Sequence, residues 1–244
     1  MRLGYLQVTE IFYSIQGEST WMGLPCIFIR LTGCHLRCVY CDSEHAFYGG
    51  VPMSYDEILE AIRRYPCRTV EITGGEPLLQ KNVIPLMELL LRQGYRVLLE
   101  TSGALSIEDV PPPVIKVVDV KCPDSGAFPT FYFPNFRWLA PWDQLKFVIR
   151  SWRDFAWAVD FVREMDLIGR WEVLFSPAHE EFPAKALARA ILATGLPIRL
   201  QVQLHKYIHL AEDERMDPAV WDVLRSRGVV REPISDTRDP VPGT

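Results

Sequence analysis

Short runs of β-branched and other apolar residues recur along this chain of 244 residues and alternate with amphipathic segments. The runs with the length of buried strands are 26–31, 69–73, 96–100, 114–120, 144–149, 171–175 and 198–204. Buried strands that alternate with helices form βα units, whose strands lie parallel in one sheet. The pattern therefore predicts an α/β fold, and it fits both an open or closed βα barrel and a doubly wound sheet.

Helical periodicity and capping residues mark the segments between several of these runs. Apolar residues recur every three or four positions in 58–65, 83–90, 152–165 and 187–194. Ser54 and Glu57 have the spacing of a capping box. Ser151 is the expected cap of the third helix, and Pro183 is expected in the first turn of the fourth. The stretches 101–113 and 121–141 contain several prolines and are predicted to be loops with at most short helices.

The chain has the features of one large domain. It shows no internal repeat and no Gly/Ser linker, and its length suits a single α/β unit. We expect a core domain at 1–231 and a tail at 232–244 that has little to bury and is poorly ordered. The net charge of −5 argues against a general nucleic-acid binder.

The same sequence gives no sign of a membrane or secreted protein. No apolar run reaches the roughly 18 residues that a membrane span needs, and the N-terminus lacks the features of a secretory signal. We therefore expect a cytoplasmic protein without a membrane partner. Thiols stay reduced in that compartment, where clustered cysteines more often serve metals or catalysis than disulfides.

Three cysteines, Cys34, Cys38 and Cys41, follow a strand-like run with C-x3-C-x2-C spacing. A disulfide would use two of these thiols and leave the third without a partner. A zinc site would need a fourth ligand, for which His35 and His45 lie near in sequence. A four-iron, four-sulfur (4Fe-4S) cluster on three thiolates would keep one iron open for chemistry. The spacing favours this cluster and leaves the zinc site open.

The residues around the cysteines resemble the signature of the radical S-adenosylmethionine (radical SAM) superfamily. In that superfamily the open iron binds the amino and carboxylate groups of SAM. Tyr40 matches the aromatic residue common before the third cysteine. The stretch TGGEP at 73–77 resembles the glycine-rich motif that meets the methionine amino group, and ETSG at 100–103 follows at the end of the next run. The resemblance implies a partial or modified βα barrel of a single domain that binds a 4Fe-4S cluster and SAM.

Longer motifs resemble one family within this superfamily, the 7-carboxy-7-deazaguanine synthases. They are IFYSIQGEST (11–20), GLPCIFIRLTGCHLRCVYCDS (23–43), DVKCPDSG (119–126), LKFVI (145–149) and VQLHKY (202–207). The resemblance implies a radical SAM carbon–nitrogen lyase. Its reaction contracts a ring of 6-carboxy-5,6,7,8-tetrahydropterin to give 7-carboxy-7-deazaguanine and ammonia, in the biosynthesis of 7-deazapurines such as queuosine. It further implies Mg2+, an electron donor such as flavodoxin or ferredoxin, and a homodimer.

The resemblance also assigns roles to individual residues. The implied substrate contacts are Ile15, Gln16, Gly17, Glu18, Arg30 and Thr73. The implied SAM contacts are Gly74, Gly75, Glu76, Glu100, Ser102, Asp119, Val120, Lys121, Gln203, Leu204, His205 and Lys206. The implied metal ligands are Cys34, Cys38, Cys41 and Ser43.

Two of these roles have a clear chemical reason. Arg30 matches the arginine that holds the substrate carboxylate, and a guanidinium does so through two parallel hydrogen bonds. Ser43 stands where the family usually has a threonine that binds magnesium, and its hydroxyl oxygen suits this hard cation. Asp42 is either a further ligand of this ion or an ordinary loop carboxylate, and the loop role is the one we expect. The remaining cysteines, Cys26, Cys67 and Cys122, are expected to be small apolar side chains in the interior.

Two other functions share some of these features. A glycyl-radical-enzyme activase uses the same cysteine spacing but acts on a protein partner, and it would lack the SIQGE stretch. A regulatory module with a zinc site would contain no iron or acid-labile sulfide.

Overall fold

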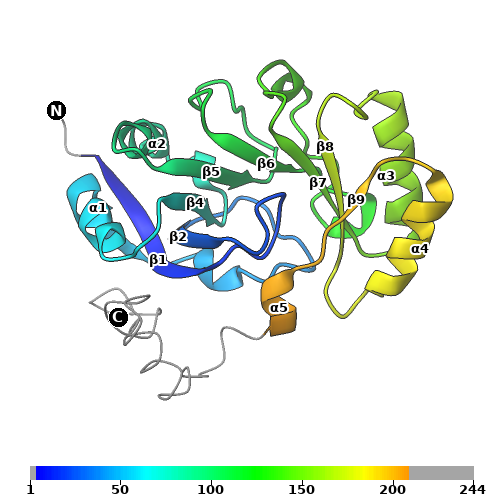
Figure 1. The fold of residues 1–244 in the computed structure, drawn as a ribbon, viewed down its shortest axis with the longest axis horizontal. Helices are drawn as coiled ribbons and strands as arrows, with labels where there is room; N and C mark the ends of the chain where they lie inside the picture. The colour runs from blue at the N-terminus through cyan, green and yellow to red at the C-terminus, as the bar shows by residue number, and fades with distance from the viewer. Residues whose placement is uncertain (1–3, 209–244) are drawn as a thin grey trace, which may run out of the picture.

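In the computed structural model, which describes residues 4–208, the strands form one sheet in the order β3-β1-β2-β4-β5-β6-β7-β8-β9 (Figure 1). Their bounds are β1 Tyr5–Ile15, β2 Pro25–Leu31, β3 Val51–Ser54, β4 Thr69–Gly74, β5 Arg96–Thr101, β6 Ile115–Asp119, β7 Gln144–Ile149, β8 Glu172–Pro177 and β9 Arg199–Leu200. All neighbours from β2 to β9 are parallel, whereas β1 pairs antiparallel with β2 and β3. The strands at the two ends of the order do not pair, so the sheet is a partial barrel.

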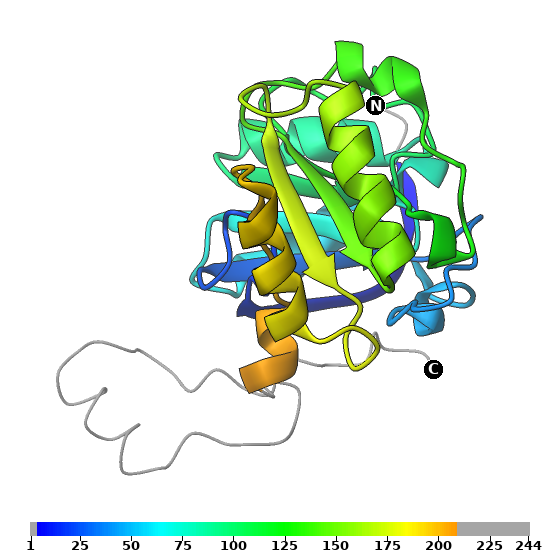
Figure 2. The same ribbon diagram turned by 90° about the vertical axis from the view of Figure 1, so that its right-hand side faces the viewer.

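Helices cover the outer face of this sheet at both of its ends (Figures 1 and 2). The α-helices are α1 Tyr55–Arg63, α2 Val83–Arg92, α3 Trp152–Glu164, α4 Ala184–Thr194 and α5 Leu204–Ile208. Short 3-10 helices are η1 Glu44–Ala46, η2 Pro77–Leu79, η3 Pro123–Ser125 and η4 Phe133–Arg137. None of the helices in the described residues is both long and apolar enough to cross a membrane.

The helix starts follow the capping residues of the sequence. The Ser54 side chain accepts a hydrogen bond from the Glu57 N–H, and the Glu57 carboxylate accepts one from the Ser54 N–H. Ser151 caps α3 in the expected way. Pro183 occupies the N-cap position, one residue before α4 begins, and not the first turn. The predicted loops at 101–113 and 121–141 contain only the short helices η3 and η4.

Most of the expected strands form, but three parts of the sheet differ from the sequence prediction. The prediction of a strand over 198–204 is wrong beyond Leu200, where the strand β9 ends. The chain turns away from the sheet there, and Leu204 donates its N–H to the Gly17 carbonyl and begins α5. Strands β1 and β3 were not predicted, since both mix polar and apolar residues at one edge of the sheet. The predicted boundary at 231 and the tail 232–244 lie outside the described residues.

The two faces of the sheet have opposite chemistry because successive side chains of a strand point to opposite sides. On β4, Val70 and Ile72 are fully buried in the apolar core with residues of α2 such as Leu86. Their neighbours Glu71 and Thr73 line a cavity on the inner face. A second apolar cluster lies under α3 and α4. The helices therefore stabilise the outer face, and the inner face is available for polar groups.

Two leucines on helices test this division. Leu86 on α2 is fully buried, whereas Leu192 on α4 is 81% exposed. We expect Leu86→Ala to lower the free energy of unfolding by about 2–5 kcal/mol, because it leaves a cavity in the core. The matched change Leu192→Ala should alter it by no more than about 0.5 kcal/mol. Urea unfolding followed by circular dichroism measures both, and equal effects would contradict the packing described here.

Candidate active site

A cavity of about 670 Å³ lies on the inner face of the sheet. The loops that follow β2, β4, β5, β6 and β8 contribute to its wall, as is usual for ligand sites of parallel sheets. All of the predicted site residues line this cavity except Glu76, Val120 and Leu204. Segments that are far apart in sequence, from Ile15 to Lys206, therefore meet around one space.

The three cysteines of the motif form one wall. Cys34, Cys38 and Cys41 follow β2 and are half-buried. The Arg37 guanidinium, which lies between them in sequence, donates from Nη1 to the Cys34 carbonyl at 2.9 Å and to the Leu36 carbonyl at 2.7 Å. Burial raises the pKa of the Cys38 and Cys41 thiols, so iron would displace protons when it binds. The loop holds the three sulfurs toward one cavity, which fits a 4Fe-4S cluster.

The glycine motif after β4 packs directly on this cysteine loop. Gly74 has a φ of 142°, which L side chains rarely adopt. A Cβ atom on Gly75 would lie 2.3 Å from the Gly33 carbonyl oxygen and 2.8 Å from the Cys34 Cβ. A side chain at Gly75 would thus push the first cysteine out of place.

Glu76, the next residue, joins two neighbouring strand ends. Its side chain is buried and is not part of the cavity lining. The carboxylate accepts hydrogen bonds from the Thr101 hydroxyl at 2.8 Å and from the Ser102 N–H at 2.8 Å. It therefore ties the end of β4 to the end of β5.

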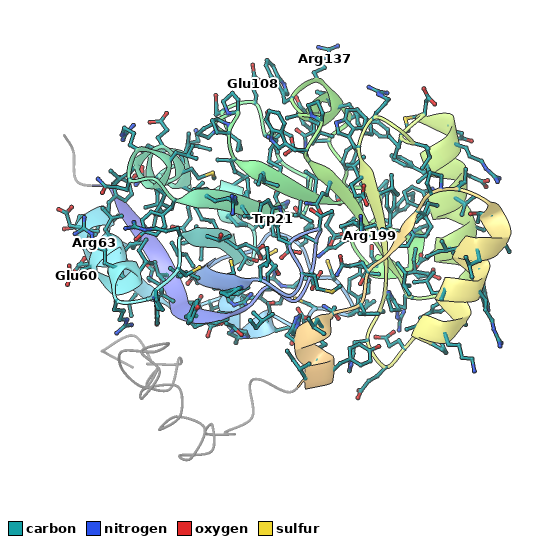
Figure 3. All side chains as sticks on the ribbon, in the orientation of Figure 1. Trp21, Glu60, Arg63, Glu108, Arg137 and Arg199 are labelled. Carbon is teal, nitrogen blue, oxygen red and sulfur yellow. The ribbon has the colours of Figure 1, made fainter. Side chains whose placement is uncertain are left out.

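The β1–β2 loop closes the opposite end of the site. Thr20 and Gln144, the first residue of β7, exchange two hydrogen bonds of 2.9 Å. Trp21 is labelled near the centre of the view in Figure 3, and the Arg96 guanidinium at the start of β5 stacks 4.4 Å from its ring centroid. These contacts carry the loop across the N-terminal ends of the parallel strands.

The same loop directs two predicted substrate contacts into the cavity. The Gln16 side chain donates to the Glu71 carboxylate, and its own oxygen accepts from the Glu18 N–H at 3.0 Å. The Gln203 amide donates to the Glu18 carboxylate at 2.9 Å. A Cβ on Gly17 would lie 2.0 Å from His205 Nδ1. The early IQGE segment and the late QLHK segment thus share one wall.

Lys146 on β7 lines the cavity among four acidic side chains, and together these residues are the cavity floor: Lys146, Glu18, Glu71, Glu100 and Asp119. The Lys146 Nζ is 3.0 Å from Glu18 Oε2, contacts the Glu100 carboxylate and is 3.9 Å from Asp119 Oδ2. Asp119 also pairs with Lys121 at 2.8 Å. Burial lowers the pKa of Lys146, but the three carboxylates outweigh it and hold that pKa well above its usual value.

The carboxylates of the floor differ in their affinity for protons. Burial raises the pKa of Glu18, but the Lys146 ammonium and the Gln203 hydrogen bond outweigh it and lower the pKa overall. Glu71 is buried beside Glu100 and Glu18, and both effects hold its pKa well above the usual range. Burial also raises the pKa of Glu100, although Lys146 opposes it. The floor combines an ionised acceptor at Glu18 with a more easily protonated acid at Glu71.

Arg30, on β2, lies at the wall between the floor and the cysteine loop. Its Nη1 donates to the Ser43 hydroxyl at 3.2 Å, and the Ser43 hydroxyl donates to Asp42 Oδ1 at 3.1 Å. Asp42 pairs with Lys206 at 2.7 Å. Burial raises the pKa of Asp42, but Lys206 outweighs it and leaves the pKa far below the usual range. Asp42 is therefore an ionised side chain of the cavity wall with a fixed partner. The sequence predicts only an ordinary loop carboxylate at this position.

Several residues that line the cavity were not predicted from the sequence. Lys146 and Glu71 had a usable signal, since each places a charge inside an otherwise apolar strand, QLKFVI and TVEIT. Ser176, Ala178 and His179 line it from the end of β8, where the position after a predicted strand was the only signal. Among the cysteines outside the motif, Cys26 and Cys122 are buried as expected and Cys67 is half-buried. Within residues 4–208 no group of three His, Cys, Asp or Glu side chains is arranged to hold a single metal ion.

This fold and this wall of cysteines define a radical SAM protein, and the model of the radical SAM superfamily matches residues 28–111. The 7-carboxy-7-deazaguanine synthase of Koribacter versatilis is 45% identical over 85% of this chain and 98% of its own. That of Chlorobaculum tepidum is 40% identical over 83% of this chain and 94% of its own. The chain belongs to the 7-carboxy-7-deazaguanine synthase family.

A solved structure agrees with this assignment at the level of the fold. The crystal structure of QueE from Escherichia coli matches with a TM-score of 0.69 and 24% identity, over 82% of this chain and 95% of that one. The partial barrel of the radical SAM type is therefore confirmed. Family membership also decides against the activase and the zinc module.

Replacing Lys146 tests the charged floor. Lys146→Met removes the ammonium and leaves Glu18 and Glu100 unpaired, so we expect a loss of about 3 kcal/mol in the free energy of unfolding at neutral pH. Glu18, with its lowered folded pKa, contributes stability above its ordinary pKa and loses it as the pH falls through the folded value. The difference between variant and wild type should therefore shrink in acid.

Urea unfolding between neutral and acidic pH measures this difference. Lys185→Met is the matched control, because Lys185 is an exposed lysine on α4, and it should change stability by no more than about 0.5 kcal/mol. A Lys146→Met protein as stable as the control at neutral pH would contradict the ion-pair network.

Proposed function

We propose that this chain is a 7-carboxy-7-deazaguanine synthase, which converts 6-carboxy-5,6,7,8-tetrahydropterin to 7-carboxy-7-deazaguanine with release of ammonia. The observation that carries the proposal is one cavity in which the three cysteines face Arg30 and the acidic floor. The family membership gives the reaction class, a radical SAM carbon–nitrogen lyase. The residues that line the cavity support a role for Arg30 and Glu18 in binding this substrate.

The cofactors would occupy the side of the cavity near the cysteines. Cys34, Cys38 and Cys41 would hold a 4Fe-4S cluster, and the backbone at Gly75 and the Asp119–Lys121 segment would hold SAM. Together the cluster and SAM supply the removal of a hydrogen atom from the substrate, which is chemistry that no side chain provides. Glu76 would support the SAM site indirectly, because its carboxylate holds the ends of β4 and β5 together.

The protein's own residues would bind and orient the substrate on the other side. Arg30 would hold the carboxylate. The pterin ring carries N–H groups, for which the ionised Glu18 is a charged acceptor, and charge-assisted hydrogen bonds of this kind are the stronger ones. Lys146 keeps the Glu18 and Glu100 carboxylates in fixed positions. The β1–β2 loop closes the floor and limits the access of water.

We further propose that Mg2+ binds beside Ser43. The donor set there fits this ion, because the Ser43 hydroxyl lies 3.1 Å from Asp42 Oδ1, the oxygen of that carboxylate that does not pair with Lys206, and both offer oxygen. The substrate carboxylate would come from the Arg30 side, since Arg30 already contacts Ser43. The ion would help to orient the substrate. Serine retains the hydroxyl oxygen of the threonine that is usual in the family.

The remaining expectations concern partners and location. A flavodoxin or ferredoxin is our proposed electron donor, a homodimer our proposed assembly, and the cytoplasm our proposed location. Queuosine is the proposed end product of the pathway. For the QLHK segment, which the sequence assigned to SAM, the contacts of His205 with Gly17 and of Lys206 with Asp42 favour the substrate side of the cavity.

An anaerobic assay with carboxytetrahydropterin, SAM and a reductant tests the main proposal. The wild type should form 7-carboxy-7-deazaguanine. Cys34→Ala should lose both the brown colour of the cluster and the activity, because three thiolates are needed to hold it. Cys67→Ala, which replaces a half-buried cysteine outside the motif, should keep both the colour and the activity. A wild type with a full cluster but no turnover of the carboxypterin would contradict the proposed function.

The metal site has its own test. We expect Mg2+ to raise the rate, and Ser43→Ala to need at least about tenfold more Mg2+ for the same response because it loses an oxygen ligand. Ser43→Thr should behave like the wild type, and the KM for SAM should not change in either variant. A wild-type rate that responds neither to added Mg2+ nor to EDTA would remove the metal from the proposal.

A further inference from the structure

Arg30 has a cross-strand partner that has no part in the proposed reaction. Glu10 on β1 lies directly opposite Arg30 on β2. Arg30 Nε donates to Glu10 Oε1 at 2.7 Å, and the two side chains are only 17% and 27% exposed. Glu10 lines the same cavity. The pair is therefore part of the cavity wall and not a surface ion pair.

A bulge in β1 brings Glu10 to this position. Val8 pairs with Leu31, and Glu10 pairs with Arg30, so two steps along β1 correspond to one step along β2. In a regular strand Val8 and Glu10 would point to the same face. Val8 is fully buried in the core instead, while Glu10 faces the cavity. Bulges of this kind commonly redirect a side chain beside an active site.

The surroundings leave one edge of the Arg30 guanidinium for another ligand. Glu10 takes Nε, and the Phe12 ring lies 5.8 Å from the guanidinium carbon. The second carboxylate nearby, Asp42, pairs with Lys206 at 2.7 Å and accepts from Gln203 at 3.2 Å. Asp42 is thereby occupied by cations and donors other than Arg30. The Nη1 edge then contacts only the neutral Ser43 hydroxyl among the partners found in residues 4–208.

We propose that Glu10 is a positioning residue, which fixes the Arg30 guanidinium at Nε so that its Nη edge faces the substrate carboxylate. This inference rests on the proposed function, because it assigns Arg30 to that carboxylate. A guanidinium offers its donors in a rigid fork, so one anchored nitrogen sets the direction of the others. Without the anchor, the long side chain would have to order itself each time a substrate binds, which lowers affinity.

The charge of Glu10 agrees with this role. Burial raises the pKa of Glu10, but Arg30 outweighs it and lowers the pKa overall, so Glu10 is ionised at neutral pH. His45 Nε2 lies 3.3 Å from the same oxygen and supports Glu10 from the solvent side. A glutamine at this position would keep an oxygen acceptor for Nε, whereas alanine would remove it. The two substitutions therefore separate the oxygen acceptor that fixes Arg30 from the negative charge of the carboxylate.

Steady-state kinetics on the reconstituted enzyme test the proposal. Glu10→Ala should lower kcat/KM for the carboxypterin by about tenfold or more, mainly through KM, as expected for a misplaced charged contact. Glu10→Gln should stay within about threefold of the wild type. Iron content and the KM for SAM should be unchanged in both variants. Equal losses in Glu10→Ala and Glu10→Gln would overturn the positioning role.

A double-mutant cycle shows whether Glu10 acts through Arg30. Arg30→Ala should itself lower kcat/KM by at least about tenfold, because it leaves the substrate carboxylate without its partner. In that background Glu10→Ala should have no further effect, since residues that act through one another are not additive. Additive losses would show that Glu10 acts elsewhere and would refute the proposal. A tetrahydropterin without the carboxylate should inhibit the wild type and Glu10→Ala equally.

Glu172 provides the matched control. It accepts from Arg199 Nε at 2.5 Å between neighbouring strands β8 and β9, outside the cavity lining, where Figure 3 labels Arg199. Glu172→Ala should leave kcat/KM within about threefold of the wild type. A wild type that does not turn over the carboxypterin would refute the proposed function. A working wild type with unchanged kinetics in Glu10→Ala would refute only the role of Glu10.

Discussion

The buried Lys146 ammonium is the interaction on which the arrangement of the site depends. It joins carboxylates from the β1–β2 loop, from β5 and from the end of β6, at Glu18, Glu100 and Asp119. A buried charge is costly unless it is paired, so these segments are stable together only in one arrangement. The apolar outer face holds the strands against the helices, and the ion pairs of the inner face fix how far the loop and the strand ends approach. The ion pairs thus keep a polar cavity open on the inner face, where apolar side chains would have packed together and filled the space.

The cysteine loop depends on tight backbone packing rather than on charge. Gly75 lies so close to Gly33 and Cys34 that a Cβ atom would not fit. Glu76 then fastens this layer to β5 through Thr101 and Ser102. The consequence is that the glycine motif has two tasks, because it both supports the first cysteine and exposes backbone on the cavity side. A rigid support of this kind suits a site whose cofactors must be held at fixed positions.

The wall at Arg30 shows how two acidic residues near one arginine can have different tasks. Glu10 is aimed at Nε by a bulge in β1, whereas Asp42 is held by Lys206. The Arg30 guanidinium is thereby held by a carboxylate at Nε, while its Nη edge has no carboxylate partner among the described residues. Because preorganised donors lose less entropy when a ligand binds, this division of partners favours recognition of a small anionic substrate. The wall also joins the two ends of the described chain, since β1 and α5 both contribute residues to the cavity lining.

Local signals in the sequence determined the parallel strands, the helix starts at Ser54 and Ser151, the loops around η3 and η4 and the motifs that identify the family. These features depend on side-chain period, capping and spacing over a few residues, which a sequence displays directly. Strand pairing decided the rest. The bulge that turns Glu10 inward cannot be found from periodicity, because it reverses the alternation between Val8 and Glu10. Lys146 appeared in the sequence only as a charge in an apolar run, and its partners lie from 27 to 128 positions away. Register and long-range ion pairs are properties of the assembled sheet, so only the tertiary structure could show which charges meet.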